Sequence, residues 1–375
     1  MTQDAYCSMI HGGLALDFVI DVPRAQHCCL RNHTFAIDTT TNFWLDKNFI
    51  PLRDKNAIDR QWDAGCANCE RLEKAGMPSF RTGMNQGLGV LGKTNLSGPA
   101  RIDMLFDISC NLACRTCGPQ SSTYWQHHLK QHGEWPQAIF SPKKRDQAVH
   151  ALKQLDLSNL RQLVFCGGET LLGQEYWNVA RWLTQNVPNA KDQLTICFQT
   201  NGTQTIPKRY FDIIENTKLV KLHISIDGIH DRFEYLRWPA KWPDTMANIF
   251  DIRDTCPSNV MFVIEETVSV FNVLYLAEAD AWIRNNFSTN REGDIVNHTR
   301  HLAHGLYSLD NSSQDLIDLL KKSGNYDLVP RGWQEKPETI QRMLAEIRKF
   351  DSIRGQSFQE VFPEVWRCFE RFHQQ

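Results

Sequence analysis

The chain has 375 residues, with 41 Lys and Arg against 43 Asp and Glu. This balance gives no basic surface of the kind that binds nucleic acid or an anionic membrane. Hydrophobic residues make up 42% of the sequence, so the chain can bury a sizeable core, and its length suits two domains or one with a large extension.

Twelve cysteines set the first constraint on the chemistry. The sequence shows neither a signal peptide nor an apolar run of about eighteen residues, so we expect a soluble, cytoplasmic protein with no membrane partner. In a reducing compartment, clustered cysteines are more often metal ligands than disulfides.

Residues 1–98 alternate short apolar runs with turns and carry five of the cysteines. These are Cys7, Cys28, Cys29, Cys66 and Cys69. The stretch 13–22 predicts one strand of a small hairpin, which Pro23 closes before the chain returns to the Cys28-Cys29 pair. Cys66-x2-Cys69 has the spacing of metal ligands, and Cys7 with one member of the pair would complete four. Residues 87–98 are glycine-rich and predict a linker or turn.

The central motif is a strand that leads into a cysteine loop. Apolar residues alternate from Ile102 to Ile108 as in a buried strand. Three thiols follow directly: Cys110, Cys114 and Cys117. Such a loop places soft ligands at the carboxyl end of a sheet, where α/β proteins build their sites. A closed zinc or electron-transfer site uses four ligands, so three thiols would leave one iron of a four-iron cluster open.

From residue 100 to about residue 300, strand-like and helix-like runs alternate, which predicts repeated βα units around a parallel sheet. The expected strands are 101–109, 160–166, 193–199, 219–226, 259–267 and 294–298. The expected helices are 119–131, 172–186, 207–215, 243–253 and 274–286. Residues 132–155 form an insert that we expect to be a surface excursion. The sequence after residue 302 predicts helices over 312–322, 337–350 and 360–374, with an N-cap signal at 310–314.

Two of the expected strands end in groups that suit a ligand. Gly167, Gly168 and Glu169 follow the strand 160–166. The glycines would let a ligand lie against the backbone, and the carboxylate could accept hydrogen bonds from an ammonium group. The next strand ends in a Thr-Asn-Gly-Thr segment, residues 200–203, which is either a simple turn or part of a cofactor site.

Two further strand ends carry titratable side chains. Alternation along 219–226 places His223, Ser225 and Asp227 on one face of the strand, which would be the interior or the mouth of a barrel. Small hydroxyl and carboxylate groups of this kind suit ribose hydroxyls. Glu265 and Glu266 lie together at the end of the strand 259–267. Paired carboxylates can do acid–base work, but we expect one to face inward and the other outward.

The Cys110-x3-Cys114-x2-Cys117 spacing, with Asn111-Leu112 in its first gap, resembles the cluster loop of the radical S-adenosylmethionine (radical SAM) superfamily. The Gly-Gly-Glu motif one strand later strengthens the resemblance. It implies that the three thiols hold a [4Fe–4S] cluster whose free iron chelates S-adenosylmethionine. The reduced cluster would then cleave that cofactor to a 5′-deoxyadenosyl radical. The resemblance also implies an open (β/α)6 partial, TIM-like barrel, which six strands suit better than a full eight.

The same resemblance assigns the cofactor contacts. The residues that would orient S-adenosylmethionine are Gly167, Gly168, Glu169, Ser225, Arg237 and, as a weaker contact, Asp227. Arg237 resembles the family arginine that pairs with the methionine carboxylate; the alternative is an exposed loop arginine. Thr116 departs from the family, which often has an aromatic residue there, so adenine contacts must come from elsewhere.

Residues 1–98 resemble the twitch module, the shortened relative of the SPASM auxiliary-cluster extension, placed here ahead of the barrel. The resemblance rests on Cys28-Cys29 and on Cys66-x2-Cys69-x3-Glu73, followed by Ala75-Gly76 and Ser79-x-Arg81. It implies that four thiols hold a second, auxiliary iron–sulfur cluster: Cys7, Cys28, Cys66 and Cys69. Val22-Pro23-Arg24-Ala25 replaces the usual glycine turn, which leaves both Cys28 and Cys29 open as the ligand. The alternative is a zinc knuckle or a site emptied by divergence.

These features predict an α/β protein in three parts. Residues 1–98 would be the auxiliary-cluster domain, 99–300 the partial barrel and 301–375 a helical C-terminal extension. The implied activity is oxidoreductase-type hydrogen abstraction from a substrate C–H, with a reductant such as flavodoxin or ferredoxin. The first expectation for the substrate is a ribosomally synthesised peptide. The alternatives are a dehydrogenase for a small molecule, such as a sugar or amino acid, and a non-catalytic iron–sulfur or zinc scaffold.

Overall fold

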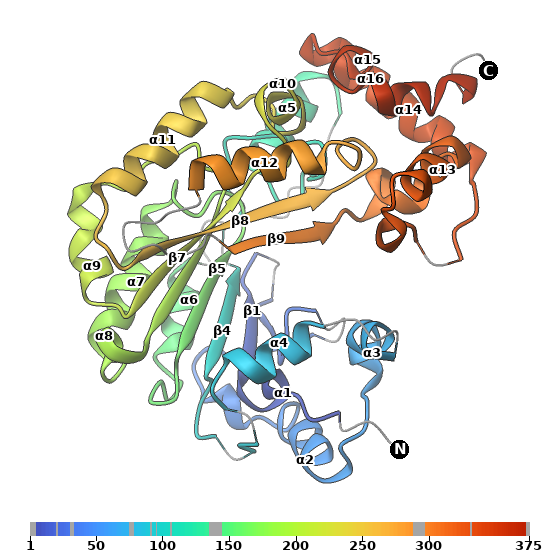
Figure 1. Cartoon of the computed structure of the whole chain (residues 1–375). Helices are drawn as coiled ribbons and strands as arrows, with labels where there is room; N and C mark the ends of the chain where they lie inside the picture. Colours follow the sequence, from blue (N-terminus) through green and yellow to red (C-terminus); the bar gives the residue numbers. More distant parts are fainter. Residues whose placement is uncertain are drawn as a thin grey trace.

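The fold is that of a computed structural model of the chain. It describes residues 5–19, 22–30, 34–74, 79–90, 92–94, 96–105, 107–134, 145–287, 297–330 and 332–372. Figure 1 shows a twisted sheet with helices packed around it and a helical C-terminal part at the far end from the N-terminus. Within the described ranges, no helix has both the length and the apolar character needed to cross a membrane.

The described residues form a nine-stranded sheet in the order β3-β2-β1-β4-β5-β6-β7-β8-β9. The strands are β1 Gly13–Asp17, β2 Arg24–Gln26, β3 Phe35–Ala36, β4 Arg101–Leu105, β5 Gln162–Cys166, β6 Thr195–Thr200, β7 Leu219–Ser225, β8 Val260–Val268 and β9 Asn297–Leu302. β4 to β9 are parallel neighbours and correspond to the six expected strands. The beginning of the last expected strand, 294–296, lies outside the described residues.

β1 joins the N-terminal segment to the same sheet. Its antiparallel pairing with β2, with Ala15 opposite Gln26, confirms the predicted hairpin. β1 also pairs in parallel with β4, so that Leu14 lies beside Ile102 and Leu16 beside Met104. The sequence pattern did not predict this second pairing. The sheet therefore runs on across the expected boundary at residue 98, and the three-part division stays a prediction.

The helices are α1 Ser8–Gly12, α2 Ile50–Asp59, α3 Ala67–Lys74, α4 Phe80–Gly87, α5 Thr123–Gln131, α6 Arg145–Leu152, α7 Gln174–Asn186, α8 Ala190–Gln193, α9 Phe211–Glu215, α10 His230–Leu236, α11 Trp242–Thr255, α12 Leu276–Phe287, α13 Gln314–Lys322, α14 Pro337–Arg354, α15 Phe358–Val361 and α16 Pro363–Arg367. α7 forms where Trp177, Ala180 and Leu183 recur at helical spacing and are buried on one face. The N-cap signal ahead of α13 is confirmed, because the Ser313 hydroxyl accepts a hydrogen bond from the Leu316 N–H.

Two helical expectations were wrong in part. Residues 135–144 of the insert lie outside the described residues, but α6 at its end is no surface excursion, since Ala148, Ala151 and Leu152 are fully buried in the main core. The expected helix 360–374 is divided into α15 and α16, because Pro363 has no N–H to donate to the preceding turn. Its last residues, 373–374, lie outside the described residues.

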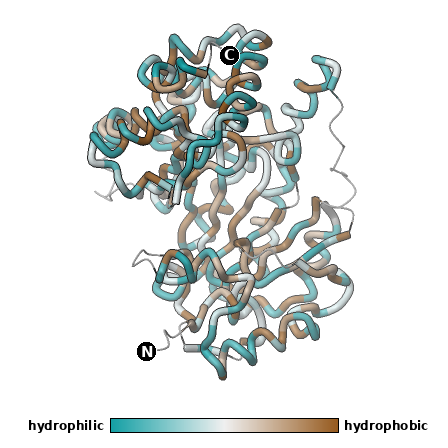
Figure 2. Tube along the Cα trace, turned by 90° about the vertical axis from the view of Figure 1, so that its right-hand side faces the viewer, coloured by the Kyte–Doolittle hydropathy of each residue, from teal (hydrophilic) through white to brown (hydrophobic). Residues whose placement is uncertain are grey.

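The main core lies between the sheet and its helices, where Ile102, Phe165 and Phe198 pack from three adjacent strands. A second core joins α13, α14 and the following helices to the segment after β8. Figure 2 shows hydrophobic stretches along the strands in the middle of the molecule. Because side chains alternate along a strand, the other face of the sheet carries polar residues such as the Arg101–Asp103 ion pair.

Candidate functional site

The three predicted cluster ligands lie on one loop at the carboxyl end of β4, residues 109–118, which we call the three-thiol loop. The Trp125 indole donates a hydrogen bond to the Cys114 carbonyl at 2.9 Å. The backbone N–H of Ala113 donates to the Trp238 carbonyl at 2.8 Å. Burial raises the pKa of the Cys110 thiol to about 11 and also raises the pKa of Cys114. A metal group that bound these sulfurs would have to displace their protons, because only the thiolate is a metal ligand.

The C-terminal helix α14 holds the three-thiol loop from behind, a contact that the sequence analysis did not identify. Arg115, within the loop, donates to the Asp351 carboxylate at 2.5 Å and to the Gln356 side chain at 3.0 Å. The Arg115 side chain is fully buried and stacks on the Tyr235 ring at 4.3 Å. Tyr235 also donates to Asp351, at 2.8 Å. The loop is thus fixed in part by Asp351 and Gln356, which lie more than 200 positions away in the sequence.

The two glycines of the Gly-Gly-Glu motif are required by the backbone of the neighbouring strand end. A Cβ on Gly168 would lie 2.2 Å from the Ser109 carbonyl oxygen, and one on Gly167 would lie 2.2 Å from the Asp107 carbonyl oxygen. Gly167 also has a φ of +139°, which other residues rarely adopt. We expected the glycines to make room for a ligand; the structure shows that they also bring β5 against the three-thiol loop.

Glu169 connects the ends of β5 and β6 at the same edge. Its carboxylate accepts hydrogen bonds from the Thr200 hydroxyl at 2.7 Å, from the Asn201 N–H at 2.6 Å and from the Leu171 N–H at 2.9 Å. Burial raises the pKa of Glu169, and the three hydrogen bonds, which favour the charged form, offset only part of this rise. Oε2 accepts only the Asn201 bond among the described residues, so it keeps a lone pair for an ammonium group.

The turn after β6 contacts the three-thiol loop and is not a simple turn. The Asn201 side chain donates to Asn111 at 3.1 Å and lies 3.8 Å from the Cys110 sulfur. Asn111 in turn donates to the Thr203 hydroxyl at 2.9 Å. Hydrogen bonds to ligating sulfurs tune a cluster's reduction potential. Asn201 therefore lies against the three-thiol loop, a position that the sequence left undecided, and its place after a strand was the available signal.

Arg237 is buried and pairs with Asp227. The distance from its Nη2 to the Asp227 Oδ2 is 2.7 Å, and Oδ1 of the same carboxylate accepts the Thr267 N–H at 2.7 Å. Arg237 is thus no exposed loop arginine, because only 8% of its surface is accessible. Its buried Nε has no hydrogen-bond partner among the described residues, which suits a carboxylate ligand. Ser225 ends β7 beside Glu265 and is half-buried.

An ion pair joins β7 and β8 on one face of the sheet. The His223 Nδ1 lies 2.6 Å from the Glu265 Oε1. Burial alone would lower the pKa of His223, but Cys197 and Glu265 outweigh it and raise the pKa to about 9. Glu266 points to the other face, where it pairs with Arg300 at 2.8 Å. The expectation that one glutamate faces inward and one outward is therefore confirmed.

The four predicted auxiliary ligands line a single pocket, which we call the four-thiol pocket. Its lining includes Cys7, Cys28, Cys66 and Cys69. Cys29 does not line it and is exposed, so the geometry favours Cys28 as the ligand. Burial raises the pKa of the Cys7 thiol to about 11. Four soft thiols around one apolar pocket match the donor set of an iron–sulfur cluster or a zinc ion.

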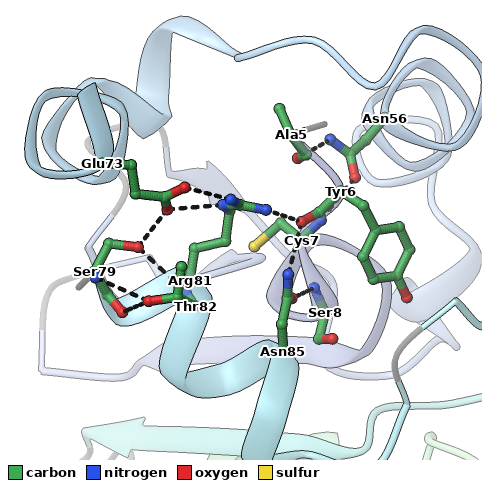
Figure 3. A network of polar contacts seen from close by, with 10 residues as sticks. All are labelled: Ala5, Tyr6, Cys7, Ser8, Asn56, Glu73, Ser79, Arg81, Thr82 and Asn85. Carbon is green, nitrogen blue, oxygen red and sulfur yellow. Dashed lines mark hydrogen bonds and ion pairs between the residues drawn. The ribbon is translucent and has the colours of Figure 1, made fainter. Parts of the chain in front are cut away.

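The backbone around Cys7 is held by polar side chains from α2 and α4 (Figure 3). The Tyr6 carbonyl accepts from Arg81 at 2.5 Å and from Asn85 at 2.9 Å, and the Cys7 N–H donates to Asn56 at 3.2 Å. Arg81 is itself held by an ion pair with Glu73. The Glu73 and Arg81 positions of the predicted motif thus fix the backbone beside the Cys7 thiol. Ala75-Gly76 lies outside the described residues.

Residues 108–272 match the family model described as the Radical SAM superfamily, which covers less than half of the chain. The match includes the three thiols, the Gly-Gly-Glu motif, Ser225, Asp227 and Arg237. A comparison of the sequence with curated proteins finds no match.

Among solved structures, the chain is similar to SuiB of Streptococcus suis, with 12% identity and a TM-score of 0.36 over 94% of this chain and 73% of that one. For SuiB bound to S-adenosylmethionine the values are 11% and 0.34, over 88% and 68% of the two chains. For SuiB bound to the precursor peptide SuiA they are 12% and 0.35, over 94% and 74%. These likenesses are too weak to carry an argument about this chain.

Proposed function

We propose that this protein is a radical SAM enzyme with an auxiliary iron–sulfur cluster in its N-terminal part. The observation that carries the proposal is the meeting of three thiols, the Glu169 carboxylate and the Arg237 guanidinium at the carboxyl end of a parallel sheet. The match of residues 108–272 to the Radical SAM superfamily model supports it independently.

Each of these residues has a distinct task in the proposed site. Cys110, Cys114 and Cys117 would hold a [4Fe–4S] cluster, which supplies the electron that cleaves S-adenosylmethionine to a 5′-deoxyadenosyl radical. The free lone pair of Glu169 would accept from the cofactor's ammonium group, and the unpartnered Nε of Arg237 would donate to its carboxylate. Ser225, half-buried at the end of β7, would contact the ribose. Asp227 already binds Arg237 and Thr267, so its task is to orient Arg237.

The four-thiol pocket would hold the auxiliary cluster through Cys7, Cys28, Cys66 and Cys69. With four ligands it would be coordinatively closed, which favours electron transfer from a substrate radical over direct substrate binding. The polar contacts around Tyr6 and Cys7 fix one of these ligands before the metal group binds. The required electron for the first cluster would come from a flavodoxin or ferredoxin.

For the substrate we propose a ribosomally synthesised peptide, from which the radical would abstract a hydrogen atom. The support is the resemblance of residues 1–98 to the twitch modules of peptide-modifying enzymes. A small molecule such as a sugar or amino acid is the competing substrate class. A flanking short reading frame that encodes a peptide would provide the first substrate to assay.

The test is anaerobic turnover of S-adenosylmethionine with dithionite, read as 5′-deoxyadenosine by mass spectrometry. We expect product from the wild type and none from Cys114→Ala. Cys256→Ala is the matched control, because Cys256 is a buried thiol at the end of α11 and should leave turnover intact. Equal product from wild type and Cys114→Ala would refute the proposal. Iron in the wild type without any 5′-deoxyadenosine would favour the non-catalytic scaffold.

A further inference from the structure

A buried arginine behind the three-thiol loop has no ion-pair partner among the residues that the structure describes. Arg354 ends α14 and is 9% exposed. Its Nε donates to the His128 Nε2 at 3.4 Å, while Nη1 and Nη2 have no hydrogen-bond partner among the described residues. The neighbouring Arg115 differs, because it is paired with Asp351. A buried charge without a partner is costly, so its retention calls for a reason.

Arg354 keeps its charge at neutral pH. Burial, followed by repulsion from Arg115, lowers the pKa of Arg354 to about 9, so the side chain remains a cation at pH 7. His128 is neutral at pH 7, because burial and Arg354 lower its pKa to about 4, so it adds no second positive charge beside Arg354. The side of the loop that faces α14 therefore carries one positive charge beyond the Arg115–Asp351 pair.

The rings of Trp125 and Trp238 connect Arg354 to the three-thiol loop. Its guanidinium stacks on the rings of Trp125 at 4.6 Å and Trp238 at 4.8 Å. Trp125 donates to the Cys114 carbonyl, and the Trp238 carbonyl accepts the Ala113 N–H. These rings stabilise the cation in part through its attraction to their faces. The Nη1 and Nη2 atoms of Arg354 are buried, so the charge is weakly screened by water.

We propose that Arg354 supplies an uncompensated buried positive charge that raises the reduction potential of the cluster on the three-thiol loop. The inference rests on the proposed function, since it needs a cluster at that loop. A [4Fe–4S] core with three thiolates carries a net charge of about −1, and about −2 after reduction. A fixed cation nearby stabilises the reduced form more than the oxidised form. Arg354 thus acts on the cluster through its charge and does not touch the reacting atoms.

The test is a potentiometric titration of the reconstituted full-length protein under anaerobic conditions, followed by electron paramagnetic resonance. We expect Arg354→Gln to make the cluster's potential more negative. We expect a shift on the order of tenfold in the reduction equilibrium, the effect of one unit charge roughly 12 Å away at an effective dielectric of about 20. A tenfold change equals 59 mV for one electron. Arg354→Lys keeps the charge and should remain near the wild-type potential.

Two further variants separate charge from structural damage. Arg342→Gln removes the same charge from an exposed position on α14 and should leave the potential unchanged. Asp351→Asn removes a negative charge from the same region and should shift the potential to more positive values, whereas general loosening would shift both variants alike. The cluster in the four-thiol pocket provides an internal reference whose potential should stay constant.

The inference is overturned if Arg354→Gln retains iron and keeps the wild-type potential, or if Arg354→Lys shifts as far as Arg354→Gln. If Arg354→Gln fails to retain iron, the sign of the Asp351→Asn shift decides, and a zero or negative shift overturns the proposal. Iron content of the wild type is measured first. A three-thiol loop without iron would refute the proposed function as well, whereas a loaded loop with unmoved potentials would refute only the role of Arg354.

Discussion

Gly168 provides a direct test of how the Gly-Gly-Glu segment is built. In Gly168→Ala, the new Cβ would lie 2.2 Å from the Ser109 oxygen and 2.6 Å from the Ser109 carbonyl carbon. Both atoms belong to the backbone, so the two strand ends must move apart. That movement strains two hydrogen bonds, Gly168 N–H to Asp107 at 3.2 Å and Glu169 N–H to Ser109 at 2.8 Å.

The expected cost follows from these contacts. Overpacking typically costs about 1–3 kcal/mol, and each weakened hydrogen bond adds about 1 kcal/mol. We therefore expect Gly168→Ala to lower the free energy of unfolding by roughly 3–5 kcal/mol even without S-adenosylmethionine. The measurement is urea unfolding followed by tryptophan fluorescence.

Gly83→Ala is the matched control. Gly83 is an exposed position of α4, where an added Cβ meets nothing within 4 Å. This substitution should stabilise the chain by about 0.5–1 kcal/mol, because alanine has the higher helix propensity. If Gly168→Ala unfolds within about 0.5 kcal/mol of the wild type yet no longer binds S-adenosylmethionine, the glycine serves the ligand alone and the packing argument is wrong.

Two further predictions concern ion pairs. Arg115→Gln should lower the free energy of unfolding by about 3–5 kcal/mol, because it leaves the Asp351 carboxylate without its ion-pair partner. Urea unfolding measures this free energy. A loss below about 1 kcal/mol would show that the contact does not hold the loop. His223 should stabilise the fold below pH 6.5 and lose that contribution as the pH rises through about 9, since its pKa is raised in the folded state. Relative to His223→Gln, the wild-type advantage should reach at most about 3 kcal/mol near pH 6, and an advantage that instead grows toward pH 10 would contradict the assignment.

Local sequence patterns predicted much of the fold. Alternating apolar residues located β4 to β9, and the same alternation correctly separated Glu265 from Glu266. For β1, the sequence predicted the hairpin with β2, which is local. It did not predict the pairing with β4, which joins residues more than 80 positions apart. Nothing in a two-residue period specifies which distant strand will be the neighbour.

In the candidate site, too, the features that lie within a few residues of one another were predicted, and the contacts between distant residues were not. The thiol spacings and the Gly-Gly-Glu motif were visible in the sequence because each lies within a few residues. The contacts of Asp351 with Arg115 and of Arg354 with Trp125 were not, because α14 reaches the three-thiol loop only in the folded chain. Polar residues on an amphipathic helix are usually solvated, so their pattern alone did not distinguish these two from their neighbours.

The most direct test of the whole account is the iron and sulfide content, with electron paramagnetic resonance, of the anaerobically reconstituted protein and of a Cys110/Cys114/Cys117→Ala variant. We predict about eight irons in the wild type and about four in the variant, as two four-iron clusters require. The signal that remains in the variant should be unmoved by S-adenosylmethionine. A wild type with about four irons and a variant with none would contradict the account, because the four-thiol pocket would then hold no cluster.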